Sequence, residues 1–307
     1  MNRLNATRDL IDLADQNAAP ERIRAAFLHC YDEIESGNVR LADIVNIAFE
    51  GLQGDEKLIT LYRTAALTIA QHVDNGRDGS VDNPYHNPVH FAKMVVNFRV
   101  LAALHAQQER GSPMTHTAIA EGLLAAAAHD IYHDGRGNKI GAQHTQFRLE
   151  QQSIEKAEGL CADYDAQDKR KIAHALSLIK VTDTSSDGTN ISPSLYTRSL
   201  YNRQRVEQAP PYAQALKKIL NNRQRLTIAT LLLDADIFAS VLDESCFQRE
   251  DARVSKEIEI ATGHVPDAAG SARYFLGTVL QGQATTWTAR QFVDPFIQRR
   301  LVQLIPR

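Results

Sequence analysis

The stretch LLAAAAHDIYHDGRGN, residues 123–138, places polar side chains directly after an apolar run. Residues 123–128 are small and apolar, which predicts a helix that ends inside a hydrophobic core. His129, Asp130 and His133 follow at once, and burying two imidazoles and a carboxylate is costly unless something pairs with them. A divalent metal ion is the natural partner, because imidazole nitrogen and carboxylate oxygen are its usual protein ligands.

Two further segments bring the same types of side chain to predicted helix ends. In YHNPVH, residues 85–90, two histidines stand four residues apart, and Pro88 suits a first helical turn. The apolar residues 227–233 run into Asp234-Ala235-Asp236. These two aspartates would point about 200° apart on a helix, so only one of them can face a shared site. Each motif alone is typical of a capping pair or a polar helix position, but together they predict a metal site.

Apolar side chains spaced about 3.6 residues apart dominate the rest of the chain and predict an all-α protein. Such stripes fall in residues 23–31, 41–52, 95–104, 119–128, 172–179, 226–242, 274–279 and 292–304. We find neither a convincing alternating strand pattern nor an internal repeat. We therefore expect a multi-helix bundle, with an N-terminal helical segment at residues 1–50 and one catalytic domain at residues 51–307.

The composition excludes several classes of protein. Of the 307 residues 43% are hydrophobic and 23% charged, which is typical of a globular protein, and the net charge of −3 offers no basic field for nucleic acid or an anionic membrane. Cys30, Cys161 and Cys246 lie too far apart to predict a disulfide framework. The first nine residues are too polar for a secretory signal, and the apolar runs are too short to span a bilayer. We expect a cytoplasmic protein whose partner is a small molecule; its oligomeric state is left open.

The histidine and aspartate motifs together resemble a known family. His86-Asn87-x-x-His90, then His129-Asp130-x-x-His133-x-x-x-x-Asn138 and a distant aspartate, are similar to the class I 3′,5′-cyclic-nucleotide phosphodiesterases, a branch of the HD-domain metal-dependent phosphohydrolases. The resemblance spans residues 83–240, and it is specific because two spaced motifs must coincide. Tyr85, Leu149-Glu150, residues 181–185 and Ala235-Asp236-Ile237 match as well. It implies an HD-domain or phosphodiesterase-type helical bundle.

The resemblance also implies roles for the matched residues. His86 would be the general acid, and a metal-bridging hydroxide would be the nucleophile. The first metal ion would be held by His90, His129, Asp130 and Asp236, with Asp130 also reaching the second ion. Metal-bound water and the pocket wall would be contacted by His133, Glu150, Thr182 and Asp183, Asn138 would fix the loop after His133, and substrate would be contacted by Tyr85, Gln291 and Phe292. The implied cofactors are two divalent ions, zinc in the tight site and magnesium or manganese in the second.

The sequence departs from the family pattern in two places. Asp134-Gly135 stands where Pro-Gly is usual, and Ala289 stands where a base-reading glutamine is expected before Phe292-Val293-Asp294. Gln281, Gln283 and Gln291 are alternative candidates, so the preferred base is left open.

Three functions are compatible with these observations. The leading one is hydrolysis of 3′,5′-cyclic nucleotides to 5′-monophosphates. A phosphohydrolase of the same type could instead act on a nucleotide monoester or another phosphoester, and a non-catalytic, metal-bearing module could bind nucleotides. An acid at His86 also needs a nearby carboxylate to keep its proton beside metal ions, and the sequence does not identify that carboxylate.

Overall fold

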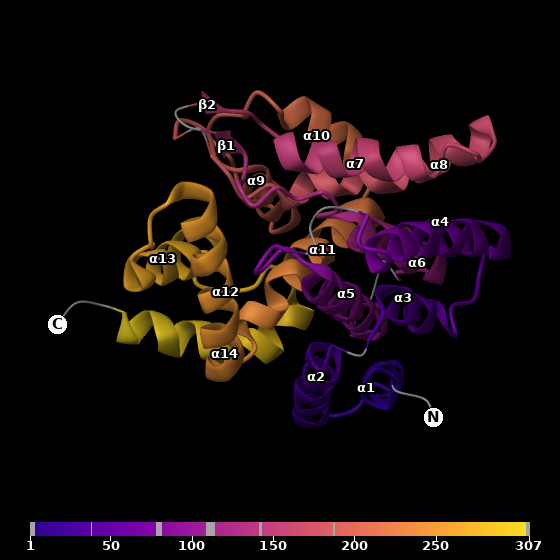
Figure 1. Cartoon of the computed structure of the whole chain (residues 1–307), viewed down its shortest axis with the longest axis horizontal. Coiled ribbons are helices and arrows are strands. Elements are labelled where there is room, and N and C mark those ends of the chain that lie inside the picture. The colour runs from indigo at the N-terminus through magenta and orange to yellow at the C-terminus, as the bar shows by residue number, and fades with distance from the viewer. Residues whose placement is uncertain are drawn as a thin grey trace.

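The computed structural model of the chain describes residues 4–37, 39–77, 82–108, 114–140, 143–186 and 188–304. Most of these residues are helical, and the only strands among them are two residues long each, which confirms the expected all-α class (Figure 1). The helices are α1 Asn5–Asp15, α2 Pro20–Glu35, α3 Leu41–Phe49, α4 Glu56–Asp74, α5 Pro88–Gln108, α6 His116–Ala128, α7 Arg148–Leu160, α8 Ala166–Leu176, α9 Pro193–Tyr201, α10 Ala213–Ile219, α11 Arg223–Val241, α12 Glu244–Thr262, α13 Ala268–Arg273 and α14 Trp287–Gln303. A 3₁₀ turn, Ser177–Thr182 (η1), follows α8, and a π-helical turn, Tyr274–Val279 (η2), follows α13. Strands β1 Lys139–Ile140 and β2 Gln143–His144 form one short antiparallel pair.

Two long helices, α5 and α11, form the centre of the molecule. They pack against each other, and α5 also contacts α1, α2, α3, α6 and α14. As a result residues 90–105 of α5 are buried without interruption. A helix that is apolar on all sides belongs inside a protein, and α5, α6 and α11 follow that rule. Polar side chains at the ends of these helices are therefore held by a packed, largely apolar surrounding.

The close approach of α5 and α6 depends on one glycine. Gly122 of α6 faces the ring of Phe98 on α5, and a Cβ at this position would overlap that ring. Because His90 lies in the first turn of α5 and His129 follows α6, this contact helps to set the distance between the two histidines.

The N-terminal helices belong to the same hydrophobic core as the rest. The Tyr31 hydroxyl of α2 donates a hydrogen bond to Asn97 Oδ1 of α5 at 2.6 Å, and Arg99 of α5 pairs with Asp15 of α1 at 2.7 Å. In Figure 1, α1 and α2 lie at the end of the molecule opposite α7 and α10. The division of the chain at residue 50 falls between α3 and α4 and stays a prediction.

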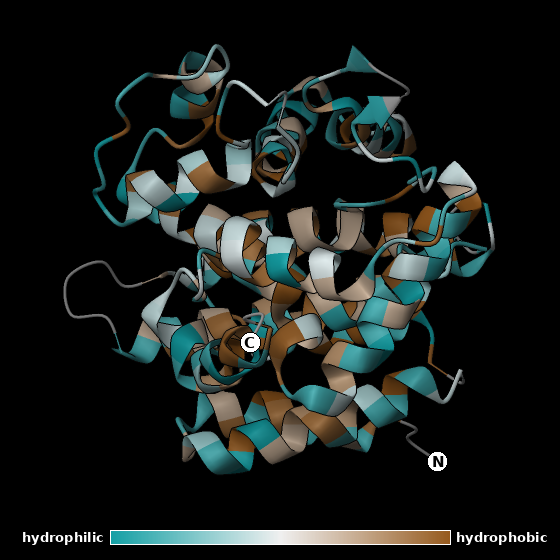
Figure 2. Cartoon of the chain, turned by 90° about the vertical axis from the view of Figure 1, so that its left-hand side faces the viewer, coloured by the Kyte–Doolittle hydropathy of each residue, from teal (hydrophilic) through white to brown (hydrophobic). Residues whose placement is uncertain are grey.

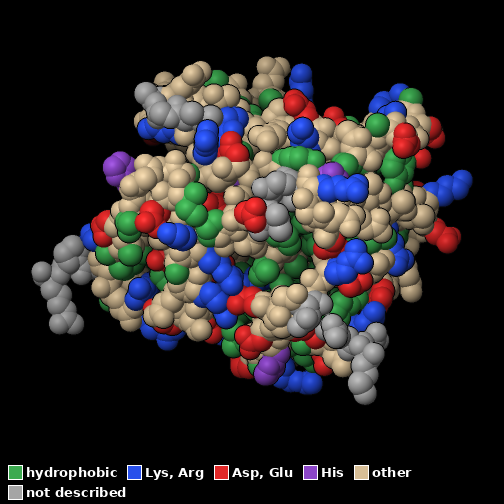
Figure 3. Space-filling model, in the orientation of Figure 1, with side chains coloured by type: hydrophobic (Ala, Val, Ile, Leu, Met, Phe, Trp, Pro, Cys, Tyr) green, Lys and Arg blue, Asp and Glu red, His purple; other side chains and the backbone are tan. Residues whose placement is uncertain are grey.

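The surface is polar and of mixed charge. Figure 2 shows hydrophobic residues gathered along the inner helix faces and hydrophilic residues outside. On the face drawn in Figure 3, basic and acidic side chains are interspersed, and no large field of one sign is visible. Among the described helices, none has the length and apolar character needed to cross a membrane.

Candidate active site

Four of the predicted metal ligands converge in space. His90, His129, Asp130 and Asp236 each offer a ligand atom, and these four atoms lie within 4.8 Å of one another. Asp236 Oδ1 is 3.2 Å from His90 Nε2, and His129 Nε2 is 3.0 Å from Asp130 Oδ2. The two Nε2 atoms are 3.1 Å apart. Two imidazoles and two carboxylates at this spacing form a donor set that could hold a divalent metal ion.

The surrounding helices fix how these side chains point. His90 lies in the first turn of α5, His129 and Asp130 follow the last residue of α6, and Asp236 lies within α11. His129 Nδ1 is 2.8 Å from the Ala126 carbonyl oxygen, and a hydrogen bond there leaves Nε2 free to face the cluster. The expectation that Pro88 opens a helix is confirmed, because α5 begins at that residue.

The charges in this cluster call for a cation at its centre. Burial alone lowers the pKa of His90, but the hydrogen bonds that its ring donates to Asp130 and Asp236 outweigh burial and raise the pKa to about 10. Burial likewise opposes ionisation of Asp130, yet His129, His86 and His90 hold its pKa well below the ordinary value. The Asp130 carboxylate thus stays ionised and attracts positive charge, which a divalent ion supplies in place of a proton. The residues present therefore fit a metal ion.

Asp234 and Asp236 face opposite directions, as their spacing on a helix requires. Asp234 is 1% exposed and accepts hydrogen bonds from the backbone N–H groups of Thr285 and Thr286 at 2.8 and 2.7 Å. The Thr286 hydroxyl also donates to it at 2.6 Å. Asp234 therefore holds the chain that leads into α14. Asp236 instead lies with His90, His129 and Asp130 in what we call the metal-ligand cluster.

A second cluster surrounds His86. His86, His133 and Glu257 offer ligand atoms within 4.8 Å of one another, and the two imidazole rings stack with centroids 3.6 Å apart. His86 Nδ1 forms a short hydrogen bond with Glu257 Oε1, and Glu257 Oε2 accepts the backbone N–H groups of Tyr85 and His86 at 3.0 Å each. His86 Nε2 lies 3.9 Å from Asp130 Oδ2, so the outer edge of the ring faces the metal-ligand cluster.

Glu257 is the carboxylate that sequence reasoning missed. It lies on α12 and is 171 positions from His86, and no motif around it marks it. Burial would raise its pKa, but the hydrogen bond and charge of His86 outweigh burial and lower the pKa to about 2. Glu257 is therefore ionised at neutral pH and can stabilise a protonated His86. Burial and the neighbouring His86 charge lower the pKa of His133 to about 4.

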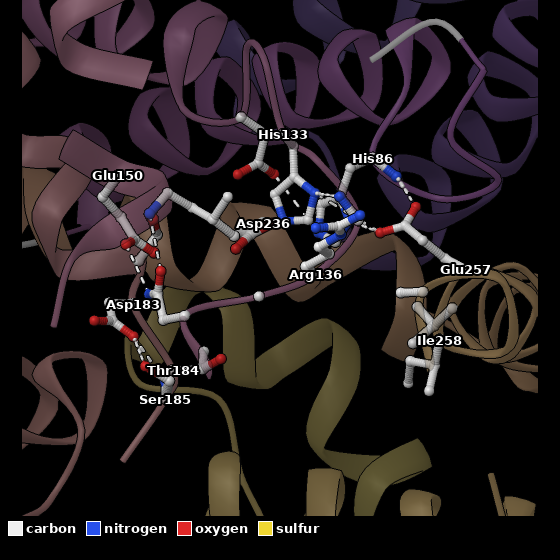
Figure 4. A pocket seen from close by; sticks show the side chains of 18 of the residues that line it. His86, His133, Arg136, Glu150, Asp183, Thr184, Ser185, Asp236, Glu257 and Ile258 are labelled. Atoms are coloured by element: carbon white, nitrogen blue, oxygen red, sulfur yellow. Dashed lines mark hydrogen bonds and ion pairs between the residues drawn. The ribbon is translucent and has the colours of Figure 1, made fainter. Parts of the chain in front are cut away.

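A cavity of about 330 Å³ opens beside both clusters (Figure 4). Asp130, Asp236, His86 and His133 line one side, and Glu257 comes from the facing helix α12. Four more of the predicted site residues line it too: they are Asn138, Glu150, Thr182 and Asp183. The structure thus brings these residues to one cavity, while their roles stay predictions.

Hydrogen bonds hold the far wall of this cavity. Asn138 Nδ2 donates to Glu150 Oε2 at 2.8 Å, and Asn138 Oδ1 accepts the N–H of Leu149 at 2.9 Å. Burial and the nearby charge of Asp183 raise the pKa of Glu150 to about 8. Asp183 accepts the N–H groups of Phe147 and Ser185. The Thr182 hydroxyl donates to the Ile179 carbonyl at 2.8 Å.

The loop after His133 carries a cation to the cavity. Arg136 lies between Gly135 and Gly137, which have φ angles of 74° and 68°, a conformation that favours glycine. Arg148 holds this loop by pairing with Asp134 at 2.7 Å and donating to the Gly137 carbonyl at 3.0 Å. Arg136 lines the cavity, and Figure 4 shows it beside His86 and His133.

A second cavity, of about 410 Å³, adjoins the first, and Tyr85 is among the residues that line it. The contact of Tyr85 with substrate stays a prediction. The described residues that line the two cavities include neither Gln291 nor Phe292. Phe292 is 1% exposed and packs edge-on against Phe27 and Phe238 in the core. Its predicted contact with substrate finds no support in this position, because α14 turns that face toward α2 and α11.

The fold of this chain is similar to that of several solved structures, although its sequence matches no family model. No protein-family model and no curated protein sequence matches this chain. Solved structures do match: the phosphodiesterase domain of Salpingoeca rosetta rhodopsin phosphodiesterase has a TM-score of 0.55 and 20% identity, covering 84% of this chain and 88% of that one. The phosphodiesterase domain of the RhoPDE fusion protein from the same choanoflagellate has a TM-score of 0.53 and 18% identity, covering 82% and 91%. LmjPDEB1 in complex with IBMX has a TM-score of 0.59 and 13% identity, covering 89% of each chain.

The architecture is therefore that of phosphodiesterase catalytic domains, as the motifs led us to expect. At identities of 13–20% this likeness establishes the fold alone. What the site does has to be argued from its side chains.

Proposed function

We propose that this chain is a metal-dependent phosphodiesterase that opens 3′,5′-cyclic nucleotides to 5′-monophosphates. The observation that carries the proposal is the position of His86. It is paired with the ionised carboxylate of Glu257 and has its free edge toward the four candidate metal ligands. The phosphodiesterase fold and the adjoining cavities support the same conclusion.

His90, His129, Asp130 and Asp236 would hold the first of two divalent ions, for which zinc suits the mixed nitrogen and oxygen donors. The second ion would be reached by Asp130 and surrounded mainly by water, which suits magnesium or manganese. When bound, two such ions activate a water molecule and stabilise charge on the phosphate oxygens. His133, Glu150 and Thr182 line the cavity where that water would lie.

The protein's own contribution is to move one proton and to place the phosphate. A water molecule gives up one proton to solvent as its oxygen attacks phosphorus. The bond from phosphorus to the ribose 3′ oxygen breaks, and that oxygen leaves with the electron pair. His86 Nε2 gives it a proton, and the imidazole later recovers a proton from solvent. Such protonation speeds a step by about 10²–10⁴-fold. The Arg136 guanidinium at the cavity matches the non-bridging phosphate oxygens.

The test is a substrate panel with the purified protein. Metal-free protein is reloaded with zinc plus magnesium or manganese, then offered cyclic AMP, cyclic GMP and the nucleoside monophosphates. We expect 5′-monophosphates from cyclic substrates and none without metal. Turnover of monoesters alone would favour the alternative phosphohydrolase. Tight binding of nucleotide to fully loaded protein without turnover would favour the non-catalytic module. A His86→Ala control should keep the metals and lose the chemical step.

A further inference from the structure

The second cavity is lined by aromatic and aliphatic side chains that could enclose a planar ring. Tyr85, Phe247, Tyr274 and Phe275 line it, and its aliphatic lining comes from Ile237, Val254, Ile258 and Val279. Tyr274 is 56% exposed, so its aromatic face is available at the mouth. Aromatic and aliphatic walls of this kind hold an aromatic base by stacking. Which base they would hold depends on the polar groups among them.

The two cavities are continuous parts of one site. His86, Thr184 and Asp236 line both of them, as do Val254 and Ile258 of α12. A ligand with its phosphate at the metal-ligand cluster would therefore extend its other end into the aromatic cavity.

Most of the polar groups in the aromatic cavity already have partners. Glu250 is 4% exposed at its side chain and pairs with Lys93 at 2.6 Å and Arg253 at 3.0 Å. The Ser240 hydroxyl lies 3.4 Å from the Tyr85 hydroxyl, and Asp236 belongs to the metal-ligand cluster. The described residues provide no hydrogen bond or ion pair for the carboxylate of Asp251, which also lines this cavity.

We propose that the aromatic cavity takes the nucleobase and that the Asp251 carboxylate selects guanine. This inference rests on the proposed function for the position of the phosphate. A carboxylate only accepts hydrogen bonds, so it matches a base edge that presents two adjacent N–H donors. Guanine offers such an edge at N1 and the 2-amino group. Adenine places a lone-pair acceptor, N1, beside its amino donor, which an acceptor would repel.

Burial supports the same assignment. Partial desolvation raises the pKa of Asp251, and the charge of Arg300 opposes it. A half-buried carboxylate to which no described residue donates is costly, and two N–H donors from a base would offset that cost. A bidentate contact of this kind discriminates between bases by roughly 10- to 100-fold.

The experiment compares two bases in two measurements that do not depend on each other. Turnover is measured as kcat/KM for cyclic GMP and cyclic AMP, and binding is measured by calorimetry with 5′-GMP and 5′-AMP on metal-loaded protein. Wild type is compared with Asp251→Asn and with Glu259→Gln, which removes a carboxylate from the same helix outside the cavity. We expect wild type and Glu259→Gln to prefer guanine by about tenfold or more, and Asp251→Asn to lose that preference.

The outcomes separate this inference from the proposed function. If cyclic nucleotides turn over but Asp251→Asn changes both bases equally, or wild type prefers adenine, the role of Asp251 is overturned while the hydrolase remains. If nothing turns over and 5′-GMP binding is still lost selectively in Asp251→Asn, the base-reading role stands and the hydrolase falls. Circular dichroism of each variant checks that the helices are intact.

Discussion

Asp234 and Asp236 show how two identical side chains two positions apart acquire different tasks. We expect Asp236→Asn to lose bound metal, because the cluster then keeps one carboxylate and two imidazoles. Asp234→Ala should keep its metal but unfold more easily, by about 1–3 kcal/mol for each N–H donor left unpaired at Thr285 and Thr286. Metal content per folded protein and urea unfolding measure the two effects. Equal metal loss in both variants would contradict the assignment.

The Glu257 carboxylate predicts a pH dependence of stability. Its pKa in the folded protein, about 2, is below the ordinary 4.5, so its stabilising effect is complete above pH 4.5 and is lost as the pH falls toward 2. At neutral pH, Glu257→Gln should reduce the free energy of unfolding by on the order of 3 kcal/mol, and the difference from wild type should shrink below pH 4.5. Urea unfolding at pH 7 and pH 3.5 measures this. A difference that stays constant with pH would rule out ionisation of Glu257 as the cause.

The sequence allowed the candidate site residues to be predicted where side chains able to bind metal also stand at a regular spacing. The histidines and aspartates stand in two short motifs after apolar helices, and burial of such groups demands a partner. Glu257 could not be found in this way, because its partner His86 is brought to it only by the packing of α12. The proposed acid role of His86 called for a nearby carboxylate, but the chain has 37 Asp and Glu residues, and no pattern in the sequence told which of them lies beside His86.

At the scale of elements, the contact between α5 and α6 helps to set the spacing of His90 and His129, two of the candidate metal ligands. Alanine normally favours a helix by about 1 kcal/mol over glycine, but at Gly122 its Cβ would overlap the Phe98 ring. We expect Gly122→Ala to destabilise the fold by about 1–3 kcal/mol and to weaken metal binding. Gly159→Ala in α7 meets nothing within 4 Å and is the matched control, expected to be neutral or stabilising. Thermal unfolding with and without metal compares them.

The helices were predictable from the spacing of apolar residues, but which side of each helix faces the core and which faces the cavities was harder to predict. Apolar spacing correctly indicated an all-α chain, whereas the strand pair β1–β2 is only two residues long on each side and leaves no alternating pattern. In α14, residues Ala289, Phe292, Val293, Phe296 and Ile297 are all buried, so sequence alone does not tell which of them meets substrate. The fold places Phe292 in the core.

At the scale of the whole molecule, Lys93 joins distant parts of the chain. It lies on α5, is 2% exposed, and pairs with Glu35 of α2 and Glu250 of α12. Lys93→Met would leave these carboxylates with less positive charge in a buried place, and we expect a loss of about 3 kcal/mol in the free energy of unfolding. Lys256→Met, at an exposed pair with Glu259, should change stability by less than about 1 kcal/mol. Urea unfolding distinguishes the two, and similar losses would contradict a central role for Lys93.

Glu257 lies on α12, a different helix from those that position the candidate metal ligands, and this has an evolutionary consequence. One nucleotide change turns a glutamate codon into a glutamine codon. If the proposed function holds, that change at position 257 would remove the ionised partner of His86 and leave the four candidate metal ligands in place. The product would be a receptor that still captures the same molecule and holds it intact.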